Sequence, residues 1–183
     1  FLGNKIPNTG ETILGDSYNI GPGGKGCNQA IAISRLGGNV RFISKLGNDD
    51  YGKLALSKLK KDNIDTSNII ISNKHQTGVA GIHVDKNTGK NAITVVRGAP
   101  ASLTIEEIDT EVIKKSKIFL TQLEIPIEVT LHCLKVAKKN GLINILNPAP
   151  ACELSNDFFS LIDYFTPNET EAEFYTGIKI NDE

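Results

Sequence analysis

The stretch KIFLTQLEIPIEVTLHCLKVAKKNGLINIL, residues 117–146, carries the clearest structural signal of this chain. Its apolar residues form one short run at 117–123 and another at 142–146, and runs of this kind predict buried strands. Between them, residues 127–140 place their apolar side chains at helical spacing, which predicts an amphipathic helix. A strand, a helix and a second strand in this order indicate two parallel strands joined by a crossover helix, the repeating unit of an α/β protein.

The same alternation continues on both sides of this stretch. The further elements that we predict are, in chain order, a helix at 28–36, a strand at 40–46, a helix at 51–61, a strand at 69–71, a helix at 103–115 with Thr104 as its N-cap, a helix at 156–162, a strand at 164–166 and a helix after Asn168. Repeated units of this kind form a mostly parallel sheet that is covered by helices. We therefore predict an α/β fold.

Two β-rich segments interrupt the alternation. Residues 2–20 contain proline and glycine among short mixed segments, a pattern typical of turns and short strands. Residues 79–84 and 92–96 flank a loop rich in turn-forming residues, which predicts a β-hairpin. We expect the two segments to pair in one small accessory sheet, and a lid of this kind commonly closes over a substrate.

The composition argues against several classes of function. The 183 residues include 20 Lys and Arg and 21 Asp and Glu, a formal net charge of −1, so we expect no binding to nucleic acid through bulk positive charge. The chain is 39% hydrophobic and 22% charged, as in a globular domain that buries a core. Its longest apolar stretches are far shorter than the roughly 20 residues that span a bilayer, so we expect no membrane partner.

The cysteines and the absence of methionine add two expectations. Cys27, Cys133 and Cys152 show neither CxxC nor Cys/His ligand spacing, which argues against a disulfide framework and against a zinc site. Free thiols suit a reducing compartment, so we expect a cytoplasmic location, with the nucleus as the alternative. The sequence contains no Met and begins with Phe1, so we expect it to be part of a longer chain.

A glycine-rich turn, GPGGKGCN at residues 21–28, lies between a β-like stretch and a predicted helix. Glycines let a ligand approach the backbone closely, and free N–H groups at a helix start attract oxygen atoms or anions. The turn matches GxGxxG, but a polar segment precedes it and the following strand ends in Lys45-Leu46 instead of an acid, which disfavours a dinucleotide site. It also lacks the hydroxyl residue of a GxxxxGK[ST] phosphate loop.

A polyol clamp is the remaining functional interpretation of this turn. Lys25 and Asn28 supply hydrogen-bond donors, and Asn28 supplies an acceptor as well, which is the mixture that a sugar hydroxyl needs. A tight turn that only caps the helix, with Lys25 in solvent, stays the alternative.

Seven short stretches resemble the ribokinase/PfkB family of carbohydrate kinases. They are PNTGET at 7–12, GGKGCNQA at 23–30, GNDDYG at 47–52, TGVA at 77–80, QLE at 122–124, NPAP at 147–150 and NETEAE at 168–173. Their order and spacing follow the family over the whole chain, and four of them are most similar to its ribokinase branch. The resemblance implies a three-layer ribokinase-like sandwich with a β-sheet lid, and transfer of a phosphoryl group from magnesium-ATP to the 5-hydroxyl of D-ribose.

The resemblance also implies a domain organisation and partners. We expect one incomplete ribokinase-like domain over residues 1–183, with a lid from 1–20 and 77–97 and an α/β core from 21–76 and 98–183. The implied partners are D-ribose, ATP with Mg²⁺, a monovalent cation such as K⁺, and a second copy of the chain bound through the lid. An exposed sheet edge gives a physical reason for that pairing.

The matching positions assign roles to named residues. The resemblance places six residues at the sugar hydroxyls: Gly24, Lys25, Gly26, Cys27, Asn28 and Glu124. Glu124 would follow a parallel strand, and ligands gather beyond the carboxyl ends of such strands. An exposed loop acid is the alternative for Glu124.

Asn168 and Glu171 spell the NxxE pattern that the family uses near the nucleotide phosphates and magnesium. We therefore expect Asn168 to bind the nucleotide and both residues to lie at the metal. An Asn N-cap with Glu at the third helical position is also the pattern of a capping box. One helix start can serve both roles.

Two motifs of the family are absent. The family opens with a strand that carries a sugar-binding Asp, which by spacing would fall just before Phe1, and its C-terminal part carries a GAGD motif with the catalytic base. No GxGD occurs in this sequence. We therefore expect an N-terminal portion of the kinase that carries no catalytic residue and is inactive alone, because phosphoryl transfer depends on the missing groups.

Three other functions stay open. The nearest is another sugar or nucleoside kinase of the same family. A dinucleotide-binding oxidoreductase and a non-catalytic sugar-binding fragment belong to different classes. A hydrolase has little support, because His75, His83 and His132 lie far apart without an obvious Ser or Cys partner.

Overall fold

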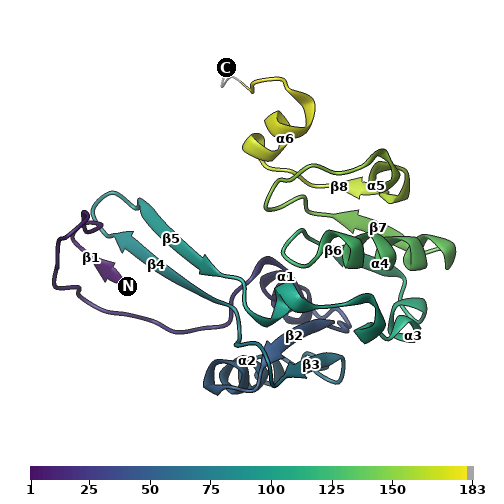
Figure 1. Cartoon of the computed structure of the whole chain (residues 1–183), viewed down its shortest axis with the longest axis horizontal. Helices are drawn as coiled ribbons and strands as arrows, with labels where there is room; N and C mark the ends of the chain where they lie inside the picture. Colours follow the sequence, from purple (N-terminus) through teal and green to yellow (C-terminus); the bar gives the residue numbers. More distant parts are fainter. Residues whose placement is uncertain (181–183) are drawn as a thin grey trace.

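The computed structural model describes residues 1–180, which form α/β units and a projecting hairpin sheet (Figure 1). The elements, with η1 and η2 as short 3-10 helices, are in chain order β1 (Leu2–Gly3), α1 (Lys25–Arg35), β2 (Ser44–Gly47), α2 (Asp50–Lys61), β3 (Ile69–Ser72), β4 (Val79–Asp85), β5 (Asn91–Val96), η1 (Ala99–Ser102), η2 (Ile105–Glu107), α3 (Thr110–Lys114), β6 (Ile118–Thr121), α4 (Ile127–Lys139), β7 (Ile143–Leu146), α5 (Asn156–Leu161), β8 (Tyr164–Phe165) and α6 (Glu169–Thr176). Helices and strands alternate except where the strands β3, β4 and β5 follow one another and where η1, η2 and α3 do.

Parallel strands form the sheets of the α/β units. β2 pairs with β3, with Ser44 opposite Ile69. β6 pairs with β7, with Ile118 opposite Ile143, and β7 pairs with β8. The unit predicted for residues 117–146 is thereby confirmed as β6, α4 and β7, and the α/β fold with mostly parallel strands is confirmed with it.

Helix α4 shows how the apolar spacing becomes packing. Val129, Cys133 and Ala137 recur at intervals of four and are buried in one cluster, whereas Leu134 packs with Phe158 in another. The helix therefore contributes side chains to two separate buried clusters. α4 is the longest helix of residues 1–180, and no helix there is long and apolar enough to cross a lipid bilayer.

Helices α1 and α2 cover the strands β2 and β3. Cys27 and Ile31 of α1 pack with Leu59 of α2 and Ile69 of β3 in one buried cluster. Burial of these side chains stabilises the pairing of the two helices with the sheet. The start of α1, where the glycine-rich turn lies, is fixed in place by this packing.

The predicted helix at 103–115 is wrong. The structure has η1, η2 and the five-residue helix α3 in this region. Thr104 is an N-cap as predicted, but it forms a capping box with Glu107 at the start of η2. Asp109 then begins α3 as a second N-cap. Two capping residues five positions apart start two separate turns, and the apolar spacing alone does not reveal this interruption.

Strands β1, β4 and β5 form a separate sheet. β1 runs parallel to β4, and β4 runs antiparallel to β5, so the expected pairing of the two β-rich segments is confirmed. Every residue of β5 is exposed. The hairpin projects from the α/β units (Figure 1), so these units leave β5 open to solvent.

Candidate functional site

The glycine-rich turn leads directly into α1. Gly24 is the N-cap residue, with φ 87° and ψ 142°, and as a glycine it has no side chain to cap the helix. Because this φ lies in the left-handed region, glycine adopts it with less strain than other residues. The first turn of a helix has N–H groups without intrahelical partners. The N–H groups at the start of α1 can therefore donate hydrogen bonds to an acceptor elsewhere in the chain or on a ligand.

Glu124 provides one such partner. It lies just after β6, and its Oε2 atom accepts a hydrogen bond from the Lys25 N–H at 2.7 Å. A carboxylate at a helix N-terminus is favourable because the first-turn N–H groups carry partial positive charge. The two residues are 99 positions apart in the sequence. The fold therefore brings together the two stretches that were expected to bind the sugar.

A pair of glutamines supports this contact. Gln122 Nε2 donates a hydrogen bond to Gln29 Oε1, which links α1 to the end of β6. A Cβ atom at Gly26 would lie 2.7 Å from Gln122 Oε1, so a larger residue there would displace the Gln122 amide. Neither glutamine was an expected site residue, although both lie in stretches that carry the family resemblance.

The other residues of the turn differ in exposure. Cys27 is buried, and burial raises the pKa of its thiol to about 11, so only its backbone is available to a ligand. Asn28 is exposed and lines a hollow of about 340 Å³ together with Ile31 and Arg35. Neither the Lys25 ammonium nor the Asn28 side chain has a hydrogen-bond partner within residues 1–180, so both stay available for a ligand.

Asn168 and Glu171 form the capping box of α6. Asn168 Oδ1 accepts from the Glu171 N–H at 2.8 Å, and Glu171 Oε2 accepts from the Asn168 N–H at 3.0 Å. The structure therefore contains the capping interaction that the sequence offered as an alternative. α6 lies apart from α1 in Figure 1, so these residues are not brought to the glycine-rich turn. Their roles at a nucleotide and a metal stay predictions.

The structure also tests whether these residues suit a metal ion. Within residues 1–180, no group of three or more His, Cys, Asp or Glu side chains could hold one. Glu171 has an oxygen, Oε1, that makes no hydrogen bond to the described part of the chain. Carboxylate oxygens suit a hard divalent cation, and Mg²⁺ usually keeps several waters. Glu171 therefore fits as one ligand of a metal that arrives with a nucleotide.

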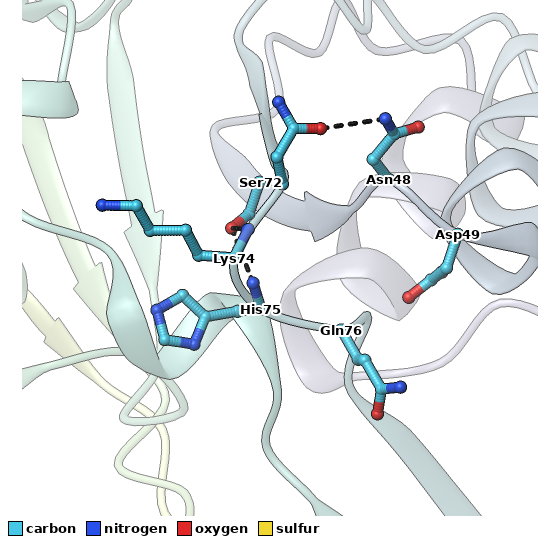
Figure 2. Close-up of a pocket in the computed structure, with 7 residues that line it drawn as sticks. Asn48, Asp49, Ser72, Lys74, His75 and Gln76 are labelled. Atoms are coloured by element: carbon cyan, nitrogen blue, oxygen red, sulfur yellow. Dashed lines mark hydrogen bonds between the residues drawn. The ribbon is translucent and has the colours of Figure 1, made fainter.

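A second, polar hollow lies at the carboxyl ends of β2 and β3 (Figure 2). Its volume is about 350 Å³. The residues that line it are Asn48, Asp49, Ser72, Asn73, Lys74, His75 and Gln76. None of them was an expected site residue, and the GNDDYG stretch was the signal that could have drawn attention to two of them. The hollow borders the first connection to the lid, because Thr77 follows Gln76.

The chain is similar to carbohydrate kinases over nearly its whole length. A model of the pfkB family of carbohydrate kinases matches residues 3–183. The chain is 43% identical over 177 residues to a ribokinase from Haemophilus influenzae, a match that covers 95% of this chain and 57% of that protein. The chain thus spans little more than half the length of this curated relative.

Solved structures agree with this similarity. A ribokinase from Thermotoga maritima matches with a TM-score of 0.85 and 40% identity, covering 96% of this chain and 57% of that one. A ribokinase from Arabidopsis thaliana complexed with ribose and ATP matches with a TM-score of 0.83 and 29% identity, covering 97% of this chain and 59% of that one. The expected ribokinase-like α/β fold is confirmed by these matches.

Proposed function

We propose, from the premise that this chain belongs to the pfkB family of carbohydrate kinases, that it is the sugar-binding portion of a ribokinase. The complete protein would transfer the terminal phosphoryl group of ATP to the 5-hydroxyl of D-ribose and release ribose 5-phosphate and ADP. The observation that carries the proposal is the hydrogen bond between Glu124 and the start of α1, because it joins the two stretches that the resemblance assigns to the sugar. The similarity to proteins named ribokinase supports ribose as the substrate.

The clamp offers both partners that a sugar hydroxyl needs. Glu124 has an oxygen, Oε1, that makes no hydrogen bond within residues 1–180. Lys25, whose N–H donates to the other oxygen of Glu124, and Asn28, three residues further along α1, hold side-chain donors without partners in the described part of the chain. A hydroxyl that donates to a carboxylate and accepts from an ammonium or amide group is held in one orientation. Such positioning raises the rate because phosphoryl transfer depends chiefly on orientation and charge stabilisation.

The hairpin sheet would close over the bound sugar. Closure of a lid excludes water, which otherwise competes with the sugar hydroxyl for the phosphoryl group. The domain organisation that we propose has this lid at residues 1–20 and 77–97, and the α/β core at 21–76 and 98–183.

A second copy of the chain is the partner that we propose for the lid. Ile82 lies opposite Ile93 in the β4–β5 ladder, and Val95 lies on the same face. These three side chains are 42%, 54% and 64% exposed. β5 is also an edge strand, and an apolar face beside an open edge favours pairing with another sheet.

ATP with Mg²⁺ is the second substrate that we propose. Asn168 and Glu171 would lie at the nucleotide phosphates and the metal, since a helix N-terminus favours anions. When bound, Mg²⁺ would neutralise charge on the transferring phosphoryl group. The general base would come from residues outside this sequence. A monovalent cation such as K⁺, and a cytoplasmic or nuclear location that suits free thiols, complete the proposal.

A substrate panel on the complete protein tests this function. We expect ATP-dependent ADP release with D-ribose, and much slower release with fructose or adenosine. Lys25→Ala should raise the KM for ribose at least about tenfold, since a charged hydrogen-bond donor is lost. Lys60→Ala removes an exposed lysine of α2 and should leave that KM unchanged. An unchanged ribose KM in Lys25→Ala would contradict the clamp, and a preference for adenosine would favour a nucleoside kinase.

A further inference from the structure

Asp49 connects the α/β core to the segment that enters the lid. Its Oδ2 atom accepts a hydrogen bond from the Thr77 N–H at 2.7 Å, and its Oδ1 atom accepts from the Thr77 hydroxyl at 2.8 Å. Oδ1 also accepts from the Gly52 N–H at 2.8 Å, which caps α2. The Thr77 hydroxyl accepts in turn from the Gly47 N–H at 2.9 Å. The Asp49 carboxylate therefore holds the start of α2 and Thr77, two positions before β4, and the Thr77 hydroxyl links both to the end of β2.

These hydrogen bonds make Asp49 a fixed, charged anchor. The Thr77 N–H, the Gly52 N–H and the Thr77 hydroxyl hold the pKa of Asp49 below its ordinary value. Thr77 is 8% exposed, so water has little access to replace the carboxylate. A buried N–H group without a partner is unfavourable, so Thr77 is strongly tied to Asp49.

The two connections of the hairpin touch each other backbone to backbone. A Cβ atom at Gly78 would lie 2.4 Å from the Arg97 carbonyl oxygen, and a Cβ atom at Gly98 would lie 2.4 Å from the Gly78 nitrogen. The Ala99 N–H donates to the Gln76 carbonyl oxygen at 2.7 Å. With no room for a side chain between them, whatever fixes the segment that enters β4 also fixes the segment that leaves β5.

The segment after β5 has its own anchor on β2. Lys45 is 7% exposed, and its Nζ atom donates to the Ser102 carbonyl oxygen at 3.0 Å and to the Glu107 carboxylate at 2.7 and 2.8 Å. Figure 2 shows Asp49 reaching from the end of β2 toward the backbone around Gln76. Both connections are therefore held from β2, whereas the hairpin itself projects with β5 exposed along its length (Figure 1).

We propose that Asp49 is a positioning residue for sugar binding, which fixes through Thr77 the direction in which the hairpin leaves the core. This inference rests on the proposed ribokinase function. The apparent affinity for a ligand falls with the fraction of molecules that are competent to bind it. A hairpin that takes several directions closes over the sugar less often, so loss of the Asp49 contact raises the KM for ribose. The KM for ATP, whose site we place at α6, does not change.

Asp49→Asn in the complete protein separates this role from helix capping. Asn caps helices about as well as Asp, but it loses the charge and one of the two oxygens that bind Thr77. We expect a rise of about tenfold in the KM for ribose with an unchanged KM for ATP, and a lower melting temperature because the buried Thr77 N–H loses its acceptor. Asp109→Asn is the matched control, because Asp109 caps α3 through the Glu111 N–H at 3.0 Å and should leave the ribose KM unchanged. A parental ribose KM in a folded Asp49→Asn protein would overturn the inference.

Variants of Thr77 decide the question if Asp49→Asn does not fold. Thr77→Ser keeps the hydroxyl and should have a ribose KM close to that of the parent. Thr77→Val keeps the shape but removes the hydroxyl, and should raise the ribose KM several-fold without changing the KM for ATP. Equal ribose KM values in the two Thr77 variants would contradict a positioning role.

Hydrogen exchange distinguishes failure of this inference from failure of the proposed function. If the complete protein does not phosphorylate ribose, the proposed function is wrong. Amide exchange in the absence of sugar then still tests the role of Asp49. Faster amide exchange at Thr77 and Ala99 in Asp49→Asn than in Asp109→Asn supports the role of Asp49 at the lid connections. Equal exchange rates in the two variants overturn it.

Discussion

The lid hairpin and the α/β units are held in place by different interactions. In the α/β units, Leu134, Leu146 and Phe158 meet in a cluster in which none of the three is more than 1% exposed. In the lid, Ile93 and Val95 are 54% and 64% exposed. The α/β units are therefore stabilised by burial of apolar surface, whereas the hairpin depends on its backbone ladder and on polar contacts at the end of β2. It follows that stability and lid position can be altered separately.

Removal of apolar side-chain atoms should show the largest difference in stability between the α/β units and the lid. Leu134→Ala removes a fully buried side chain and should lower the free energy of unfolding by about 2–5 kcal/mol, because contacts are lost and a cavity remains. Val96→Ala, at a position that is 57% exposed on the opposite face of β5 from Ile93, should lower it by less than about 1 kcal/mol. Urea denaturation of the complete protein, followed by circular dichroism, measures both. Equal losses would show that the lid is also held by burial.

Removal of a side-chain amide should have a smaller effect that again differs between the regions. Asn144 is fully buried and donates to the Leu134 and Leu161 carbonyl oxygens at 3.0 and 2.9 Å. Asn144→Ala should lower the free energy of unfolding by about 1–3 kcal/mol, because two buried hydrogen bonds to backbone carbonyl oxygens are lost. Asn87 donates to the exposed Asn4 carbonyl oxygen in the lid, and Asn87→Ala should change it by less than about 0.5 kcal/mol. Thermal unfolding compares the two, and a larger loss for Asn87→Ala would reverse the comparison.

The ion pair between Lys45 and Glu107 should make the core connection sensitive to acid. The Lys45 ammonium holds the pKa of the Glu107 carboxyl below its ordinary value. The stabilisation is complete above the unfolded-state pKa of about 4.3 and is lost as the pH falls through the lower folded-state pKa. Glu107→Gln should therefore be less stable than the parent at neutral pH and lose less further stability between about pH 5 and pH 3.

The exposed lid pair Lys86–Asp16 provides the control for this pH dependence. Its side chains are 41% and 42% exposed, and Asp16→Asn should change the free energy of unfolding by less than about 1 kcal/mol. Melting temperatures measured across the pH range compare the two variants. Parallel pH profiles for Glu107→Gln and the parent would show that Glu107 is not the titrating group.

A cysteine introduced in the lid should have the smallest effect on stability. The rate at which each thiol reacts reports directly on its access to solvent. Burial raises the pKa values of Cys27 and Cys133 to about 11, so at pH 8 only about one thiol in a thousand is ionised. Lys90→Cys places a thiol on the exposed loop of the lid hairpin and should react with iodoacetamide far faster, with little change in the unfolding curve. Mass spectrometry of the labelled peptides measures the rates, and comparable rates would mean that the core opens as readily as the lid.

The sequence predicted the parts of the molecule whose contacts are local or periodic. The unit β6, α4 and β7 follows from apolar spacing, and the capping box of Asn168 and Glu171 follows from a local pattern. The helix expected at 103–115 is wrong because Asp109 starts a new turn within a continuous apolar pattern. Spacing alone could not bring Lys25 near Glu124; the family resemblance assigned both residues to the sugar, and the structure shows the hydrogen bond between them.

Two contacts of the site escaped prediction for a physical reason. The Gln29–Gln122 bond and the Asp49–Thr77 bonds join side chains far apart in the sequence, and neither involves a repeating pattern. Each residue lies in a stretch that carries the family resemblance, but such a stretch does not say which of its members touch. The tertiary fold alone brings these partners together.

Ribose binding to the complete protein tests the central claim most directly. Isothermal titration should give a Kd for ribose that rises about 10- to 100-fold in Glu124→Gln, since a charge-assisted hydrogen bond contributes about 1.5–3 kcal/mol. Glu128→Gln removes the charge of an exposed residue in the first turn of α4 and should bind ribose like the parent. If Glu124→Gln and Glu128→Gln bind ribose with the same Kd, Glu124 and the start of α1 do not form the sugar site.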